Sequence, residues 1–335
     1  MIESVKIAVD AMGGDNSPKK IIDGIIHNYN LKDKDNFYKI FGDKDVISNL
    51  INNRVDRKFY EIIHTIEKVK STDTPLEAAK RGKKTSMWLA VESVKNKETD
   101  IVISAGNTGA LLVIAKLNLK MIENIDKPAL SALWPNKIGM SVVLDLGANI
   151  ECSSKNLIDF SLMGASLYKS LYPSQMPNVA LLNIGSEELK GNEIIKDTFQ
   201  KLNEKKSKNF TFHGYIEGNQ LMNGEVNVIV SDGFTGNVAL KTAEGTANFI
   251  TDELKKVLGG SIIGKISSLL NISNLKKFKK RLDPRLYNGA IFIGLNNPVV
   301  KSHGGTDFIG FSNSLDVCNR IIKGNLIDKI KDNIK

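Results

Sequence analysis

Cysteine is scarce in this sequence, and the cysteines that occur stand far apart. Cys152 and Cys318 belong to no Cys-x-x-Cys motif and to no cluster of cysteine and histidine. This spacing argues against a structural zinc site. So few cysteines are typical of a protein of the reducing cytoplasm, which is the compartment that we expect.

Long apolar segments are also lacking. No apolar run approaches the roughly 20 residues that a membrane-spanning helix needs. The first residues are not a basic stretch followed by a long apolar one, so we expect no signal peptide. Because neither an internal repeat nor a low-complexity linker divides the chain, we expect a single catalytic domain over residues 1–335.

Two phosphate-binding signatures are absent as well, the Gly-x-Gly-x-x-Gly fingerprint and the Walker A loop. Their absence weakens the case for a nucleotide-dependent dehydrogenase. The net charge of +9 arises from 46 basic and 37 acidic residues and is spread along the chain, apart from one local basic segment. We therefore expect no nucleic-acid partner. A chain that is 41% hydrophobic and 25% charged is ordinary for a globular protein.

Apolar runs alternate with amphipathic stretches along the chain. We expect strands at residues 5–9, 37–41, 60–64, 101–104, 129–134, 142–146, 179–184, 210–216 and 226–230, and a hairpin at 290–295 and 298–301. The longer expected helices cover residues 74–95, 159–172, 236–258 and 314–331. This alternation predicts an α/β fold with a largely parallel central sheet.

The turn at residues 104–110, Ser-Ala-Gly-Asn-Thr-Gly-Ala, indicates an anion-binding site. It stands between two apolar runs, an order typical of a strand, a turn and a helix. A helix N-terminus exposes backbone N–H groups, and its dipole favours an anion. A tight turn without a ligand explains this segment alone equally well. The candidate phosphate-binding residues are Ser104, Ala105, Gly106, Asn107, Thr108 and Gly109.

Four further turns of small and polar residues follow expected strands, at residues 10–15, 144–149, 182–188 and 230–237. In open α/β sheets, ligands bind beyond the carboxyl ends of the strands. We expect all five turns to meet at one edge of the sheet and to form one cleft, although any one of them alone is best explained as structural.

Taken together, several segments carry a family resemblance. The chain resembles the bacterial acyl-ACP:phosphate acyltransferases, the PlsX family, in DAMGGD, SAGNTGA, KPAL at 127–130, LDLGAN, NIGSEELKGN, SDGFTGNVALKTAEG and VVKSHGG, over residues 5–330. The resemblance implies transfer of a fatty acyl group from acyl carrier protein to inorganic phosphate. The acyl phosphate then serves a membrane-bound glycerol-3-phosphate acyltransferase in phospholipid synthesis. It also implies a phosphotransacetylase-like α/β/α sandwich, a homodimer, and neither metal nor nucleotide cofactor.

The chain departs from this family at residues 16–18, where Asn-Ser-Pro stands in place of the usual His-Ala-Pro. This departure argues against a catalytic histidine at that position. Lys127 stands where an arginine is common, which keeps the charge but loses the bidentate geometry.

The implied reaction needs positioning and charge stabilisation more than covalent help, because phosphate is a nucleophile and a thioester is an activated acyl donor. We expect Lys190 and Lys241 to neutralise the charge of phosphate. Asn149 and Asn237 are expected to donate hydrogen bonds to phosphate or to the thioester oxygen.

Three further side chains are candidates with structural alternatives. Asp10 and Asp232 are expected to orient the donors, and capping of a turn or a helix explains them nearly as well. His303 is the candidate for proton transfer, with a plain loop histidine as the alternative. Cys152 invites an acyl-enzyme hypothesis, but a buried inert cysteine is the commoner case, and we expect direct attack of phosphate.

Residues 257–285 form an amphipathic and basic segment that we expect to be helical and to protrude. Such a helix binds the surface of an anionic membrane, or packs on the core or on a dimer partner. The resemblance favours peripheral membrane association, and the basic end also suits the acidic acyl carrier protein. The residues expected to make these contacts are Leu258, Ile262, Ile266, Leu269, Lys276 and Lys277.

Two other functions stay open from the sequence. A phosphotransacetylase-like enzyme that uses acyl-CoA would need the same turns. A regulatory protein that binds phosphate or lipid without turnover would be stabilised by its ligand and would form no acyl phosphate.

Overall fold

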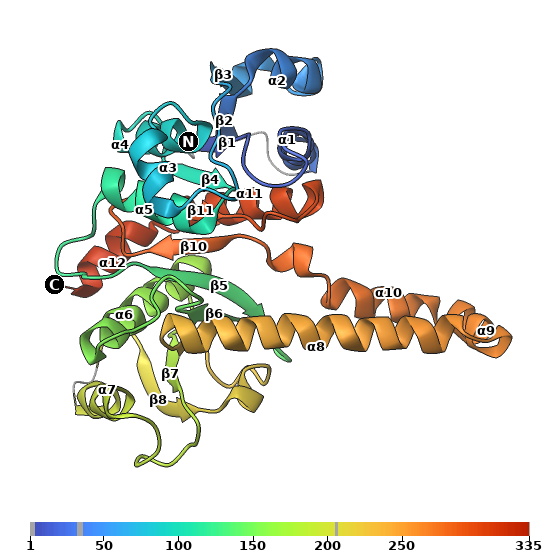
Figure 1. Ribbon diagram of the computed structural model, residues 1–335. Coiled ribbons are helices and arrows are strands. Elements are labelled where there is room, and N and C mark those ends of the chain that lie inside the picture. The colour runs from blue at the N-terminus through green and yellow to red at the C-terminus, as the bar shows by residue number, and fades with distance from the viewer. Residues whose placement is uncertain (1–3, 32–35, 205–206, 335) are drawn as a thin grey trace.

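The computed structural model describes residues 4–31, 36–204 and 207–334. Within these residues, an 11-stranded sheet runs through the molecule, and helices cover both of its faces (Figure 1). Short loops join most elements, as is usual for strands that alternate with helices.

One half of the sheet consists of parallel strands. It holds, in spatial order, β3 (Tyr60–His64), β2 (Asn36–Gly42), β1 (Val5–Asp10), β4 (Ile101–Ser104) and β11 (Val299–Lys301). The other half holds β6 (Met140–Leu144), β9 (Val228–Val230), β7 (Asn178–Leu182) and β8 (Thr211–Ile216), again parallel to one another. The predicted, largely parallel sheet is therefore confirmed.

Two strands between these halves reverse the direction of the sheet. β10 (Ala290–Ile293) pairs antiparallel with β11 and with β5 (Ala129–Pro135), and β5 pairs antiparallel with β6. The carboxyl ends of β1, β4 and β11 consequently lie at one edge, and those of β6, β9 and β7 lie at the opposite edge. The expectation that all five turns share one edge is wrong for this reason.

The helices form two layers, which the alternation of side chains along the strands explains. Val9, Ile103 and Val300 face one layer, whereas Ala8, Val102 and Val299 face the other. The first layer contains α1 (Lys19–Leu31), α2 (Lys44–Ile51), α6 (Ser154–Leu171), α7 (Glu193–Glu204), α11 (Phe308–Lys323) and α12 (Leu326–Ile334). The second contains α3 (Pro75–Arg81), α4 (Ser86–Lys95), α5 (Thr108–Leu119) and the start of α8 (Gly233–Gly259). The α/β/α sandwich is confirmed.

Two of the expected long helices are each divided in two. α3 ends at Gly82, and Thr85 begins α4 by accepting a hydrogen bond from the Trp88 N–H. In the same way Gly324 ends α11, and Asn325 follows with a φ of 49° before α12. Glycine and polar capping residues end and restart helices, so a periodic pattern alone overestimated their length.

A helical arm projects from the sandwich (Figure 1). α8 spans 27 residues, which corresponds to about 40 Å. It is followed by α9 (Ile262–Leu270) and α10 (Ile272–Arg281), and a short 3-10 turn (Pro284–Tyr287) leads back to β10. The segment at 257–285 is thus helical and protruding, as expected. Further short 3-10 turns cover Arg57–Phe59 and Gly218–Gln220.

Candidate functional site

Three turns meet at the carboxyl ends of β1, β4 and β11. We name residues 10–16, 104–109 and 302–306 the first turn cluster. A Cβ on Gly13 would lie 2.7 Å from the backbone nitrogen of Gly106, and one on Gly14 would lie 3.2 Å from the carbonyl oxygen of Gly304. Gly14 also has a φ of +84°. The turns therefore pack backbone against backbone, at a distance that only glycine permits.

A row of polar side chains crosses the ends of these strands. Asp10 is in register with Ser104, and Ser104 with Lys301, so the row spans β1, β4 and β11. The buried Asp10 carboxylate accepts hydrogen bonds from Ser104 Oγ and Ser86 Oγ, both at 2.6 Å. Ser104 Oγ accepts the Gly106 N–H at 3.0 Å. Burial raises the pKa of Asp10, and these hydrogen bonds oppose the rise. Asp10 thus holds Ser104, which in turn holds the Gly106 backbone; its expected role in orienting donors to the substrate stays a prediction.

Two buried lysines belong to this cluster, and the sequence did not single them out. Lys20 and Lys301 are 7% and 8% exposed. The Lys20 ammonium donates to the carbonyl of Gly304, and that of Lys301 to the carbonyl of Ser302. Burial lowers the pKa of Lys301 to about 8 and also lowers the pKa of Lys20. The available signal was a lysine at the end of an apolar strand, two residues before His303.

Asn107 holds the predicted phosphate turn in place rather than presenting a free amide. Its Nδ2 donates to the carbonyls of Ser71 at 3.3 Å and Asp73 at 3.1 Å, and its Oδ1 accepts the Ala110 N–H at 3.0 Å. It is the N-cap of α5. The backbone N–H groups of Thr108 and Gly109 lie in the first turn of this helix, where N–H groups have no partner within the helix. Ala105 is buried and Thr108 is exposed.

His303 follows β11 in the same cluster. Its Nδ1 accepts the Gly305 N–H at 3.1 Å, so the neutral ring carries its proton on Nε2. Partial desolvation, followed by the positive charge of Lys301, lowers the pKa of His303 below its ordinary value. The neutral imidazole can donate a hydrogen bond from Nε2, and the expected proton transfer stays a prediction.

The turns after β6 and β9, residues 145–151 and 231–237, form a second turn cluster. The buried Asp145 carboxylate accepts five hydrogen bonds, from the N–H groups of Leu130, Gly147, Ala148 and Asn149 and from Asn149 Nδ2. Asn149 Nδ2 also donates to the Pro128 carbonyl at 2.7 Å, so both of its amide hydrogens are used. Burial raises the pKa of Asp145, and the hydrogen bonds oppose that rise.

The remaining candidates lie on or beside the second cluster. Asp232 is the N-cap of α8 and accepts the Thr235 N–H at 2.8 Å. Of the two roles considered for Asp232, this contact is the helix cap. The exposed Asn237 side chain lies beside Gly147. Lys190 is exposed in the loop after β7, where Asn183 Nδ2 donates to its carbonyl. The structure therefore brings Asn149, Asp232 and Asn237 together, and Lys190 stands at the same edge.

α8 connects the two clusters. It begins beside Asn149, where the Gly233 N–H donates to the Asn149 carbonyl at 2.8 Å. Two to three turns later, Lys241 and Glu244 form an ion pair of 2.7 Å. Both charges act on the pKa of His303, Glu244 raising it and Lys241 lowering it. The strand before α8 is β9, and its carboxyl end lies at the edge opposite the first cluster. Along α8 the chain then returns, so that Lys241 lies toward the first cluster.

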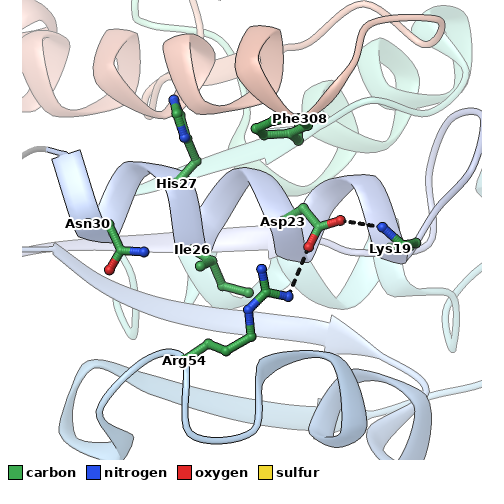
Figure 2. Close-up of a pocket in the computed structure, with 7 residues that line it drawn as sticks. All are labelled: Lys19, Asp23, Ile26, His27, Asn30, Arg54 and Phe308. Carbon is green, nitrogen blue, oxygen red and sulfur yellow. Dashed lines mark hydrogen bonds and ion pairs between the residues drawn. The ribbon is translucent and has the colours of Figure 1, made fainter.

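Two other features remain, a cysteine next to the second cluster and a surface pocket away from both clusters. Cys152 is buried, and burial raises the pKa of its thiol to about 11, so it is protonated near neutral pH. A surface pocket of about 410 Å³ lies along α1, with Arg54 and Phe308 also in its lining, and Asp23 there pairs with Lys19 and Arg54 (Figure 2). None of the predicted site residues lines it. Among the described residues, no three His, Cys, Asp or Glu side chains gather to hold a metal.

The arm carries the residues expected to contact a membrane or partner. Leu269 is 68% exposed, and Lys276 and Lys277 are exposed on α10. Leu258 is half-buried near the end of α8, and the side chains of Ile262 and Ile266 lie outside the described part of the structure. None of the described helices is long and apolar enough to cross a membrane.

The fold is similar to that of solved phosphotransacetylases. The structure aligns with a phosphotransacetylase from Streptococcus pyogenes with a TM-score of 0.61 at 15% identity, over 98% of this chain and 95% of that one. It also aligns with the EutD phosphotransacetylase from Staphylococcus aureus with a TM-score of 0.60 at 15% identity, over 96% and 94%. At these identities the likeness shows the fold alone.

Sequence comparison identifies the family. Residues 5–329 match the model of the family described as fatty acid synthesis protein. The chain is 75% identical to the phosphate acyltransferase of Pelagibacter ubique (strain HTCC1062), over all of both chains. It is 43% identical to that of Parvibaculum lavamentivorans, over 98% of this chain and 91% of that one. The chain belongs to this family and is an acyltransferase.

Proposed function

We propose that this protein transfers a fatty acyl group from acyl carrier protein to inorganic phosphate, with phosphate bound in the first turn cluster. The observation that carries the proposal is the convergence of three turns on the N-terminus of α5, where Asp10 fixes Ser104 and the Gly106 backbone. Backbone N–H groups at a helix N-terminus suit a phosphate. The names of the relatives, phosphate acyltransferase, supply the reaction class.

In this reaction a phosphate oxygen attacks the thioester carbonyl carbon. A C–O bond forms, the C–S bond breaks, and the proton of the hydrogen phosphate ends on the departing thiolate. Neutral His303 suits this step as a hydrogen-bond donor, because its Nε2–H can stabilise the negative charge on the departing sulfur while the phosphate proton passes to that sulfur. Lys241 and Asn237 on α8 are the candidates to stabilise the developing oxyanion. Lys190 lies at the opposite edge of the sheet, with the second cluster, so it is not proposed to neutralise this phosphate.

The test measures acyl phosphate, trapped with hydroxylamine, from phosphate and either acyl-ACP or acyl-CoA. We expect product with acyl-ACP at a kcat/KM at least tenfold higher than with acyl-CoA. Product from acyl-CoA alone would establish the phosphotransacetylase-like alternative. Stabilisation by phosphate without product from either donor would establish a binding protein.

We further propose that the protein is a homodimer and that its arm binds anionic membrane at its tip, where the product is passed to a glycerol-3-phosphate acyltransferase. Exposed apolar side chains on α8, such as Phe249 at 67% exposure, support pairing of two copies. The exposed Leu269 beside a lysine-rich helix supports a membrane contact. We expect Leu269→Asp to lose flotation with anionic liposomes and to keep the dimer mass. A variant that floats like the wild type would remove Leu269 from the contact.

A further inference from the structure

Lys301 is a buried cation at the carboxyl end of β11, beside the first turn cluster. We propose that its ammonium binds the phosphate substrate in the first turn cluster, as a substrate-binding residue of the reaction. The inference rests on the proposed function for the identity of the anion. It assigns a ligand to a lysine that lies in none of the predicted phosphate-binding positions.

The geometry of the sheet puts Lys301 in the site. Val299 and Lys301 lie on one face of β11, and their neighbours on β4 in register are Val102 and Ser104. Asp10 continues the same row on β1. Because side chains alternate along a strand, all members of the row point into the layer that contains α4 and α5. Lys301 therefore shares its face with the serine that holds the phosphate turn.

The hydrogen bonding of Lys301 leaves N–H donors of its ammonium for a ligand. An ammonium has three N–H donors, and the bond found for Lys301 goes to the carbonyl of the next residue, Ser302. With 8% exposure, solvent reaches little of the side chain. The nearby Asp10 carboxylate is already engaged by Ser86, Ser104 and the Met12 N–H. A buried cation with one neutral acceptor is costly, and a bound anion would complete its coordination.

The surrounding charges select for a dianion. Lys20 on α1 contributes a second buried positive charge, His303 lies in the loop after β11, and Asp10 on β1 supplies a negative one. α4 contributes the neutral Ser86, and α5 contributes the dipole of its N-terminus. Asp15 is the further carboxylate that acts on Lys20. Two ammonium groups beside a helix N-terminus suit phosphate better than a monoanion.

The burial of Lys301 has a consequence for pH. Its pKa of about 8 means that the empty site loses this charge on the alkaline side of neutrality. A bound phosphate favours the charged form, so binding at pH 8.5 to 9 is coupled to proton uptake. An arginine at this position stays charged and removes the coupling.

The experiment is calorimetric titration of the full-length protein with inorganic phosphate, without acyl donor, at pH 7 and pH 9 in buffers of different ionisation enthalpy. We expect Lys301→Gln to weaken phosphate binding roughly 10- to 100-fold at pH 7. The wild type should take up protons on binding at pH 9, and Lys301→Arg should bind without that uptake. In the enzyme assay the KM for phosphate should rise while the KM for the acyl donor stays within twofold.

The matched control is Lys329→Gln on α12. Lys329 is a half-buried lysine whose pKa burial also lowers, and it donates to the carbonyls of Lys169 and Gly324, but it lies away from the site. This variant should bind phosphate like the wild type. Wild-type affinity in Lys301→Gln would overturn the proposal. If Lys301→Gln fails to fold, the wild-type titration decides, because absence of proton uptake at pH 9 contradicts the assignment.

The two proposals fail separately. A wild type that binds phosphate through Lys301 and forms no acyl phosphate disproves the reaction and keeps the anion site. A wild type that forms acyl phosphate with a phosphate KM that Lys301→Gln leaves unchanged disproves the role of Lys301 alone.

Discussion

The two turn clusters each contain buried charge, but they satisfy it differently. In the second cluster, Asp145 accepts five hydrogen bonds from the chain around it. In the first, Lys301 donates to the carbonyl of its own neighbour, beside a second buried cation, Lys20. A carboxylate whose hydrogen bonds all come from the surrounding chain stabilises a turn. A cation whose N–H donors are only partly used by the chain is suited to bind a ligand.

Whether the chain already uses the hydrogen bonds of a polar side chain distinguishes structural from functional residues better than the residue type does. Asn107 and Asn149 were both expected to donate to substrate, and both of their amide groups serve the chain instead. Their contribution is to hold backbone N–H groups in place. The site then consists of oriented backbone and buried positive charge, which is an arrangement that stabilises anions with little reorganisation.

The largest effect is expected for Asp145→Asn. In the wild type, Oδ1 of Asp145 accepts three of the hydrogen bonds, and Oδ2 accepts the two from Asn149. An asparagine whose oxygen replaces Oδ1 would place its Nδ2 against these two Asn149 donors. Two unsatisfied, partly buried donors at about 1–3 kcal/mol each would lower the free energy of unfolding by roughly 2–6 kcal/mol. Urea denaturation followed by circular dichroism measures this loss.

Asp232→Asn is the matched control, because asparagine also caps a helix. It should change the free energy of unfolding by less than about 0.5 kcal/mol. Equal stability of Asp145→Asn and the wild type would mean that the second cluster does not depend on its central carboxylate.

The next effect concerns the stability of the wild type as a function of pH. Burial lowers the pKa of Lys301 from 10.5 to about 8, so between these values the unfolded chain binds more protons than the folded one. The contribution of Lys301 to stability therefore rises with pH across this window and is lost as pH falls through about 8. Its full size is about 3 kcal/mol.

Lys301→Met provides the comparison for this pH effect. The variant should lack the rise and should unfold at the same or a higher temperature than the wild type at pH 7, because it removes an uncompensated buried charge. Thermal unfolding at pH 7 and pH 9.5 without phosphate measures both. A strongly destabilised Lys301→Met at pH 7 would indicate a structural role for the ammonium.

A smaller effect is expected for Asn107→Ala. Loss of the N-cap of α5 should cost about 1 kcal/mol of stability, and the freed turn should bind phosphate more weakly. Steady-state kinetics should show a raised KM for phosphate and a smaller change for the acyl donor. Thr85→Ala removes an N-cap from α4 and serves as the control for capping alone. An unchanged phosphate dependence in Asn107→Ala would count against the turn as the phosphate site.

Local signals in the sequence predicted most helices and strands. Which residues come together in the site depends on strand pairing between segments far apart in the chain. Buried strands such as β4 and the turn before α5 follow from apolar runs and glycine. The hairpin of β10 and β11 was predicted and is confirmed, but nothing local shows that β5 pairs antiparallel with both β10 and β6, so the five turns were expected at one edge. The contacts that occupy Asn107 come from residues 34 and 36 positions away. Lys301 was missed because its burial depends on its neighbours in the sheet.

The smallest effect is expected for Cys152→Ala, which tests whether acyl transfer needs a covalent intermediate in the second cluster. Burial raises the pKa of the Cys152 thiol to about 11, so near pH 7 the reactive thiolate is scarce. Direct attack of phosphate needs no thiolate, and the variant should keep at least half of the wild-type kcat. Cys318→Ala, on the buried face of α11, controls for the loss of a small buried side chain. A folded Cys152→Ala protein without activity, beside an active Cys318→Ala, would replace direct attack with an acyl-enzyme and move the chemistry to the second cluster.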